Sequence, residues 1–387
     1  MKTHYRSPRS AFAHQSLPSA LLLIAAGCFS LTASAMSVTH TEYGKTKSGT
    51  SVYEYAIKND HGMSVKVLDY GGTITEINVP DRSGVSKNVV LKLGNLSAYE
   101  TRQNFSATVG RVANRISGGG FSLDGQFYAL KSNADGISLH GGVDGFATKV
   151  WRSRPFTERK QCGVEMTYIS PDGENGFPGE LTTIVRFALD NNNELTISYT
   201  ATTTKPTVVN LTHHMFLNLA GEGTAINHSI QINASHYLPM NATKIVTGEI
   251  APVAGTVFDL RAPKKLSEGN SSNDPQIQLG KGFDHAFIFD KPTKNDPFAV
   301  QLWSPESGIA MTIVTSEPSV QLYVGNGFDG KLIDASGKPI QKNYGIALET
   351  QHYPDSPNQP SFPTVTLRPG QVFKSHTQFR FGTKAIQ

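Results

Sequence analysis

Two adjacent histidines, His213 and His214, lie in a mostly apolar run that extends from Asn210 to Gly221. The run is short and rich in Thr, Phe and Met, so it favours a strand over a helix. Neighbouring side chains of a strand point to opposite faces. An apolar face then carries Leu211, His213, Met215, Leu217 and Leu219, and a polar face carries Asn210, Thr212, His214, Phe216 and Asn218. The alternation predicts that His213 is a core residue and that His214 serves in proton transfer or ligand binding.

One carboxylate, Glu349, lies in a second apolar segment, Tyr344–Gln351. Alternation places it on one face with Gly345, Ala347 and Gln351, and the small neighbours leave space above it for a ligand. Glu is seldom fully buried without a partner. Two interpretations stay open here. Glu349 is either a salt-bridged or edge-exposed residue, or a general base whose surroundings raise its pKa above ~4.3.

Polar residues of three loops and a third strand complete the candidates. In Ser319–Asn326, alternation groups Gln321 with Tyr323, a pair suited to hydroxyl recognition and ring stacking. The loop candidates are Asn114 and Arg115 in Gly110–Arg115, His140 beside two glycines, and Asp284 in Gly282–Phe287. Each also has an ordinary structural interpretation, as an ion-pair partner, a turn residue or a helix cap.

Metal chemistry and serine hydrolysis find little support in the spacing. His140, His213, His214, His285 and Glu349 are possible metal ligands, but no His-x-x-x-His or cysteine spacing groups them. Adjacent strand residues such as His213 and His214 also face opposite ways. The Gly-x-Ser-x-Gly motif of a serine hydrolase is absent. The spacing therefore does not predict a catalytic metal.

Short alternating runs separated by turn residues must position these side chains. Predicted strands include Ser64–Leu68, Leu181–Leu189, Glu194–Thr200, His228–Ile232 and Met311–Thr315. Only Asn95–Gln103 favours a short helix, and Ser267–Gln276 reads as a surface loop. Many short strands with frequent turns indicate an all-β antiparallel sandwich or barrel, which we expect to form one domain over residues 36–387.

The first 35 residues have the layout of a secretory signal peptide. Lys2, Arg6 and Arg9 precede an apolar stretch over residues 21–31, and Ala33-Ser34-Ala35 follows as a small-residue cleavage site. We expect export, most simply to a bacterial periplasm, without stable membrane insertion after cleavage. Ala25-Ala26-Gly27-Cys28 resembles a lipoprotein box, so lipid attachment at Cys28 is a second possibility.

Charge and cysteine content exclude some classes of partner and cross-link. The full chain has a net charge of +4, and the signal peptide carries three of its 35 Lys and Arg residues. The remaining near-neutral chain has no basic stripe that would suggest nucleic acid. Cys162 is the only cysteine after Cys28, so the exported chain can form no internal disulfide. We expect it in a turn and without a catalytic role.

Motifs along nearly the whole exported chain resemble those of the aldose 1-epimerase (galactose mutarotase) family. They are Leu68–Thr75, Val79–Gly84, Gly110–Ile116, Leu139–Gly142, Ser170–Gly179, Asn210–Gly221, Phe283–His285, Gln321–Asn326, Leu348–Asp355, Asn358–Pro363 and Leu367–Gly370. Each block alone is modest support, but their number and order are specific. The resemblance implies a large antiparallel β-sandwich and an isomerase of carbohydrate metabolism. Such an enzyme interconverts the α and β anomers of free aldoses of the glucose or galactose type.

The resemblance also implies roles for individual residues. His214 matches the catalytic histidine of the family motif, and Glu349 matches the catalytic glutamate. Asn114, Arg115, His140, Asp284 and Gln321 match the sugar-binding positions. A carboxylate and an imidazolium suit this chemistry, because opening a hemiacetal needs a base at the C1 hydroxyl and an acid at the ring oxygen. The implied reaction requires neither a metal nor an organic cofactor.

Two departures lie beside the catalytic histidine. The family usually has Asn where this chain has His213, and Tyr-Phe where it has Phe216-Leu217. These changes leave the catalytic position intact, so they bear on rate or sugar preference more than on reaction class. A related epimerase for another sugar and a non-catalytic carbohydrate-binding sandwich remain the alternatives.

Overall fold

A computed structural model describes residues 1–8, 36–133, 136–293 and 297–384. The unit Ser34–Gln387 is compact and contains all the described strands and helices. The predicted signal peptide lies mostly outside the described residues, so its cleavage stays a prediction. Within the described ranges, no helix is long and apolar enough to span a membrane.

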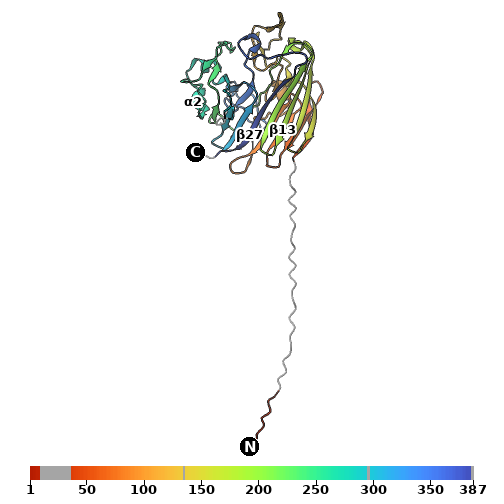
Figure 1. The fold of residues 1–387 in the computed structure, drawn as a ribbon, viewed down its shortest axis with the longest axis vertical. Coiled ribbons are helices and arrows are strands. Elements are labelled where there is room, and N and C mark those ends of the chain that lie inside the picture. Colours follow the sequence, from red (N-terminus) through yellow and green to blue (C-terminus); the bar gives the residue numbers. More distant parts are fainter. Residues whose placement is uncertain (9–35, 134–135, 294–296, 385–387) are drawn as a thin grey trace. The chain divides into compact units, whose positions relative to one another are not determined.

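Antiparallel strands build the fold, which confirms the predicted all-β sandwich. The first sheet has five strands in chain order: β1 (Ser37–Lys45), β2 (Ser51–Lys58), β3 (Ser64–Leu68), β4 (Thr73–Pro80) and β5 (Ser86–Asn88). A nine-stranded sheet follows in the spatial order β11 (Arg152–Thr157), β12 (Gln161–Ser170), β13 (Leu181–Asp190), β14 (Glu194–Thr203), β27 (Phe373–Thr383), β23 (Ile309–Thr315), β22 (Val300–Trp303), β17 (Ser229–Ile232) and β20 (Lys264–Lys265). Its long strands β13 and β27 flank β14 (Figure 1).

A second five-stranded sheet carries most of the candidate residues. Its spatial order is β19 (Ala251–Pro252), β18 (His236–Leu238), β21 (Asp284–Ile288), β24 (Ser319–Tyr323) and β25 (Ala347–Gln351). Four strand pairs are smaller: β6 (Thr108–Val109) with β16 (Thr212–His213), β7 (Arg115–Ile116) with β10 (Ser138–Leu139), β8 (Gly120–Leu123) with β9 (Gln126–Ala129), and β15 (Thr207–Val208) with β26 (Thr366–Leu367).

The few helices are short. The α-helices are α1 (Leu96–Thr101), α2 (Leu266–Asn270) and α3 (Pro275–Gly280), and Phe146–Thr148, Glu174–Gly176 and Ser356–Asn358 form 3₁₀ turns. Helix α1 confirms the predicted helix near Asn95, whose side chain caps it by accepting a hydrogen bond from the Ala98 amide. The loop expected over Ser267–Gln276 is only partly correct. Residues 271–274 form neither helix nor strand, but the single-turn helices α2 and α3, too short to show a 3.6-residue period, occupy the rest of the range.

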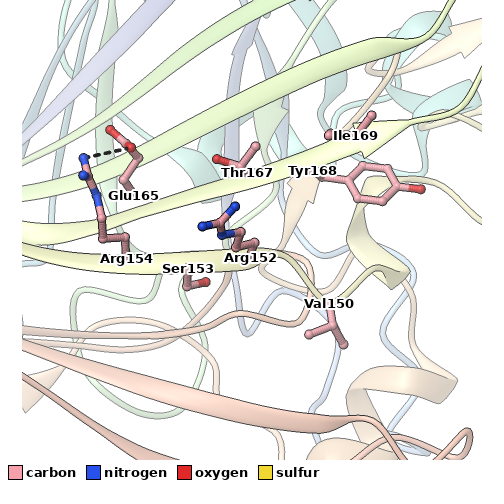
Figure 2. A pocket seen from close by; sticks show the side chains of 8 residues that line it. All are labelled: Val150, Arg152, Ser153, Arg154, Glu165, Thr167, Tyr168 and Ile169. Atoms are coloured by element: carbon pink, nitrogen blue, oxygen red, sulfur yellow. Dashed lines mark hydrogen bonds and ion pairs between the residues drawn. The ribbon is translucent and has the colours of Figure 1, made fainter.

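Cys162 is a second correction. It lies in β12 instead of a turn, and it is a buried free thiol. A surface cleft of about 620 Å³ runs along the paired strands β11 and β12 (Figure 2). Its lining includes Arg152, Thr167 and Tyr168, together with Arg154 and Glu165, which form an ion pair with each other.

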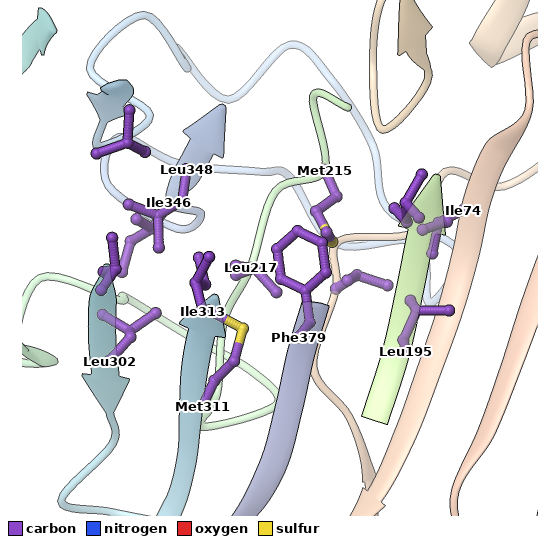
Figure 3. Packing of buried hydrophobic residues seen from close by; sticks show 14 of the residues in the cluster. Ile74, Leu195, Met215, Leu217, Leu302, Met311, Ile313, Ile346, Leu348 and Phe379 are labelled. Carbon is purple, nitrogen blue, oxygen red and sulfur yellow. The ribbon is translucent and has the colours of Figure 1, made fainter. Parts of the chain in front are cut away.

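The main core lies where the nine-stranded sheet faces the first sheet and the histidine segment, which is the stretch from Asn210 to Gly221 that carries His213 and His214. Leu195, Phe379 and Ile313 of the large sheet gather around Met215 and Leu217, with Ile74 on one side and Leu348 on the other (Figure 3). Burial of such side chains is the dominant favourable term in folding. This apolar layer therefore fixes the segment that carries His214 against the strand that carries Glu349.

Candidate active site

The 210–221 segment keeps the predicted side-chain alternation although it is hardly a regular strand. Only Thr212–His213 pairs as β16, and Leu217 makes isolated bridges to Val90 and Ile346. Met215 and Leu217 nevertheless pack into the main core, while Phe216 belongs to a separate aromatic cluster on the other side. Extended backbone is enough for alternation, because the hydrogen-bonded ladder does not set the side-chain directions.

His213 is a core residue, as the alternation predicts. Its Nε2 donates to the Gly72 carbonyl oxygen at 3.0 Å, and its ring meets the Phe187 ring edge-on. Burial lowers the pKa of His213 to about 4, so the ring is neutral at pH 7. The residue that departs from the family pattern thus faces away from His214 and serves packing.

His214 and Glu349 face each other across two segments that are distant in sequence. The His214 Nε2 lies 3.5 Å from the Glu349 Oε1, and their side chains are 12% and 3% exposed. Backbone hydrogen bonds to Ser106 and Ala107 fix the His214 main chain. On β25, Leu348 enters the core, so its neighbour Glu349 points to the opposite side.

Burial shifts the protonation equilibrium of the Glu349 carboxyl. It raises the pKa of Glu349 above the ordinary 4.5, and nearby Asp284 adds to this, while His214 and Arg115 oppose it. The Oε2 atom of Glu349 is buried and accepts no hydrogen bond from the described residues. A buried carboxylate oxygen without a donor is costly, so this atom is suited to a hydroxyl group of a ligand.

His140 is held beside this pair in a defined tautomer. The Asn114 amide donates to the His140 Nδ1 at 3.2 Å, and the His140 amide donates to the Asn114 carbonyl oxygen at 2.9 Å. Burial, together with the positive charges of His214 and Arg115, holds the pKa of His140 well below 6.5. A neutral ring that accepts at Nδ1 carries its proton on Nε2, so His140 offers a donor.

Asp284, Gln321 and Arg115 form the polar side of the cluster. Gln321 lies directly across from Glu349 on neighbouring strands, and its Nε2 donates to the Asp284 Oδ1 at 2.8 Å. Burial raises the pKa of Asp284, but the positive charges of Arg115 and Lys244 outweigh it and keep that pKa below 3.8. Asp284 is therefore an ionised acceptor.

All seven predicted site residues lie in one connected cluster. Glu349 contacts His214 and His140, with the His140 Nδ1 at 4.0 Å from the Glu349 Oε2. Asn114 joins His140 to Arg115, because its Oδ1 accepts from the Arg115 Nη1 at 3.3 Å. Asn114 therefore positions His140 through its backbone and Arg115 through its side-chain oxygen.

Sequence reasoning missed Lys244 and an aromatic cluster. The Lys244 Nζ lies 3.1 Å from the Asp284 Oδ2. Phe216 packs against His214, Phe105 and Phe328, with ring centroids 4.9 to 5.0 Å apart. Lys244 lies in a polar turn that resembles any surface turn, so its sequence carries no signal. Spacing also does not group residues as far apart as Phe105 and Phe328.

A metal ion fits the cluster poorly, although His140, His214 and Glu349 bring possible ligand atoms within 4.8 Å of one another. The His140 Nδ1 lone pair already accepts from the Asn114 amide. Histidines that bind metals usually donate their second nitrogen to an acceptor. The His214 Nδ1 finds no hydrogen-bond partner among the described residues, so His214 lacks the acceptor that a metal-bound histidine usually has.

Comparison with known proteins bears directly on the family. A family model described as "Aldose 1-epimerase" matches residues 53–380. Galactose mutarotase of Mus musculus is 42% identical over 350 residues, which are 89% of this chain and 99% of that protein. Aldose 1-epimerase of Escherichia coli (strain K12) is 34% identical over 329 residues, 84% of this chain and 94% of that protein.

Solved structures agree with this assignment. The structure of galactose 1-epimerase from Lactobacillus acidophilus NCFM has a TM-score of 0.81 and 31% identity, covering 91% of this chain and 100% of that chain. The sequence matches and the solved structure together confirm the family resemblance, the β-sandwich and the isomerase class that the motifs implied. This chain belongs to the aldose 1-epimerase family, the enzymes that interconvert the α and β anomers of aldoses.

Proposed function

We propose that this enzyme acts on free hexoses of the galactose or glucose type, with Glu349 as general base and His214 as general acid. One observation carries the assignment of roles. The His214 Nε2 lies 3.5 Å from the Glu349 Oε1, while the buried Oε2 of Glu349 accepts no hydrogen bond from the described residues. The names of relatives such as galactose mutarotase of Mus musculus support the choice of sugar.

The proposed reaction opens and closes the sugar ring. Glu349 removes the proton of the C1 hydroxyl, the bond between C1 and the ring oxygen breaks, and protonated His214 gives its proton to that oxygen. The open-chain aldehyde then rotates about the C1–C2 bond. Closure reverses both transfers: neutral His214 takes the proton from the C5 hydroxyl, and Glu349 returns a proton to the C1 oxygen. The other anomer results, and both groups regain their starting states.

Five residues are proposed to hold the sugar during these steps. His140 and Arg115 supply donors, Asp284 supplies an ionised acceptor, and Gln321 supplies both. Asn114 acts through its hydrogen bonds to His140 and Arg115. Because His140 is neutral beside His214, it adds no second positive charge next to the proposed acid.

Anomer exchange of a panel of free aldoses, followed by NMR or polarimetry, tests the proposal. We expect Glu349→Gln and His214→Asn to lower kcat by about 10²- to 10⁴-fold, the usual contribution of acid–base groups. The matched controls are Glu222→Gln and His376→Asn, because both side chains are exposed and outside the cluster. A rate equal to buffer with every aldose contradicts the proposed activity, and unchanged rates in the two site variants contradict the roles.

We further propose export to a bacterial periplasm, with cleavage after Ala35. The basic residues, apolar stretch and small-residue site within residues 1–35 support it. Cell fractionation and the intact mass of the isolated protein test this. Processing after Ala35 yields a chain that starts at Met36, whereas lipid attachment yields a lipidated chain that starts at Cys28 and is lost in a Cys28→Ser variant. A full-length cytoplasmic protein contradicts both routes.

A further inference from the structure

A hydrogen-bonded hairpin presents Lys244 to the cluster. Met240 and Val246 form a bridge, and the Asn241 amide donates to the Ile245 carbonyl oxygen at 2.8 Å. The Asn241 side chain accepts from the Ile245 amide, and the Lys244 amide donates to the Asn241 carbonyl oxygen. Lys244 has a φ of 61°, the left-handed region that few residues other than glycine adopt. The turn therefore holds Lys244 in one unusual backbone conformation.

Neighbouring elements anchor this hairpin. The Gln276 side chain of α3 both donates to the Met240 carbonyl oxygen, at 2.9 Å, and accepts from its amide, at 2.8 Å. Strand β18 precedes the hairpin and pairs with β21, so Leu238 lies opposite Ala286. Because β21 begins at Asp284, the hairpin and the carboxylate belong to the same rigid frame.

Lys244 reaches Asp284 at the edge of the cluster. Its Nζ lies 3.1 Å from the Asp284 Oδ2, and the Asp284 Oδ1 accepts from Gln321 at 2.8 Å. The Lys244 side chain is 31% exposed, whereas the Asp284 side chain is 10% exposed. The two oxygens of Asp284 are thus fixed by two donors from different elements, and only one of those donors, Lys244, carries a positive charge.

We propose that Lys244 is a substrate-positioning residue, which tightens sugar binding by fixing the Asp284 carboxylate in the orientation that accepts a sugar hydroxyl. The inference rests on the proposed sugar-binding role of Asp284. Lys244 acts on binding more than on chemistry, because its described side-chain contact is with Asp284 and neither with His214 nor with Glu349.

Removing the ammonium group leaves Asp284 with weaker support. Among the described residues, its remaining charged or titratable neighbours include Arg115, His285, Tyr323 and the like-charged Glu349. A largely buried carboxylate that loses a charged donor either reorients or takes up a proton. We expect both changes to weaken the acceptor for a sugar hydroxyl and to leave the packing that sets the distance between His214 and Glu349 in place.

Steady-state anomer exchange with galactose and glucose tests this role in Lys244→Met. The hydrogen bond from Lys244 to Asp284 is charge-assisted, but solvent screening at the partly exposed lysine weakens it, so its loss is expected to have a moderate effect on binding. We therefore expect KM to rise about tenfold while kcat stays within about twofold. Lys244→Arg restores most of the affinity, because it keeps the charge and the donors. The matched control is Lys331→Met, which removes an exposed lysine paired with Asp329 at 2.6 Å.

A double variant separates action through Asp284 from a general structural effect. In an Asp284→Asn background, Lys244→Met changes KM no further if Lys244 acts through that carboxylate. An unchanged KM in folded Lys244→Met overturns the proposal. A decrease in kcat as large as the increase in KM also overturns it. If the Met variant melts below the assay temperature, Lys244→Gln carries the same test. A wild-type enzyme with no activity contradicts the proposed function instead, so the two failures are distinguishable.

Discussion

At the scale of single residues, burial determines the protonation of the proposed base. Glu349 is almost wholly enclosed, and desolvation by burial is the largest cause that raises its pKa. His214 and Arg115 oppose this effect without cancelling it. A carboxylate with a raised pKa is a stronger base toward a sugar hydroxyl than an exposed one.

The pH dependence of the reaction follows from this shift. Only ionised Glu349 accepts a proton, so kcat/KM falls as the pH decreases through the pKa of Glu349 in the free enzyme. We expect the midpoint of this acid limb above the ordinary value of 4.5. Anomer-exchange NMR from pH 4 to pH 8 measures it. A midpoint at or below 4.5 would show that burial does not control the base.

Metal removal is the second prediction at this scale. Because Asn114 already uses the lone pair of the His140 Nδ1, the cluster binds a divalent ion weakly. We expect dialysis against EDTA to leave kcat and KM unchanged. Loss of activity that returns on adding Zn²⁺ would contradict the acid–base assignment.

At the scale of elements, close backbone contact positions His140. Gly141 follows it with a φ of +86°, and a Cβ atom there would lie 1.8 Å from the Gly110 carbonyl oxygen. Only glycine permits both the left-handed conformation and this contact. The loop that carries His140 is therefore locked against the loop that precedes Asn114 and Arg115.

A pair of glycine substitutions isolates this contact. Gly141→Ala is expected to cost roughly 3 kcal/mol of unfolding free energy or more and to lower kcat/KM, because the clash displaces His140. Gly49→Ala is the matched control: its φ is +87°, but nothing lies within 4 Å of its added Cβ. That control is expected to cost about 1 kcal/mol through backbone strain alone. Thermal unfolding and the exchange rate measure both, and equal effects in the two variants would contradict the packing argument.

At the scale of the whole molecule, buried histidines link stability to pH, and three of them lie outside the proposed acid–base and sugar-binding residues. Burial is the largest cause that lowers the pKa of His213, His228 and His285 from 6.5 to about 4. The unfolded chain binds a proton at each of them below pH 6.5, before the folded protein does. The contribution of these histidines to the free energy of unfolding is therefore complete above pH 6.5. It is lost as the pH falls toward 4, by roughly 3 kcal/mol for each histidine.

Denaturant unfolding between pH 7 and pH 4 tests this acid sensitivity. His213→Asn removes one of the three groups, so the pH slope of the unfolding free energy is expected to decrease by about one proton. His376→Asn makes the same substitution at an exposed position and is the matched control. Equal slopes in the wild type and His213→Asn would mean that burial of His213 does not oppose its protonation.

How far the sequence predicts the protein depends on the range of the interactions involved. Alternation is local, so it alone separated His213 from His214 and predicted the polar faces of Glu349 and Gln321. Turn residues and short apolar runs likewise indicated an all-β fold. The single-turn helices over Leu266–Asn270 and Pro275–Gly280 were missed because so few residues carry no periodic signal.

Only the tertiary structure decided which of these faces meet. The family motifs indicated Glu349 and His214 together. The distance of 3.5 Å between the His214 Nε2 and the Glu349 Oε1, however, depends on the packing of β25 and the histidine segment on one core. The tautomer of His140, the raised pKa of Glu349 and the contact between Lys244 and Asp284 arise from the same packing. Sequence patterns specify what each short segment exposes, whereas desolvation and ion pairing depend on segments distant in the chain, and these interactions make the polar groups a site.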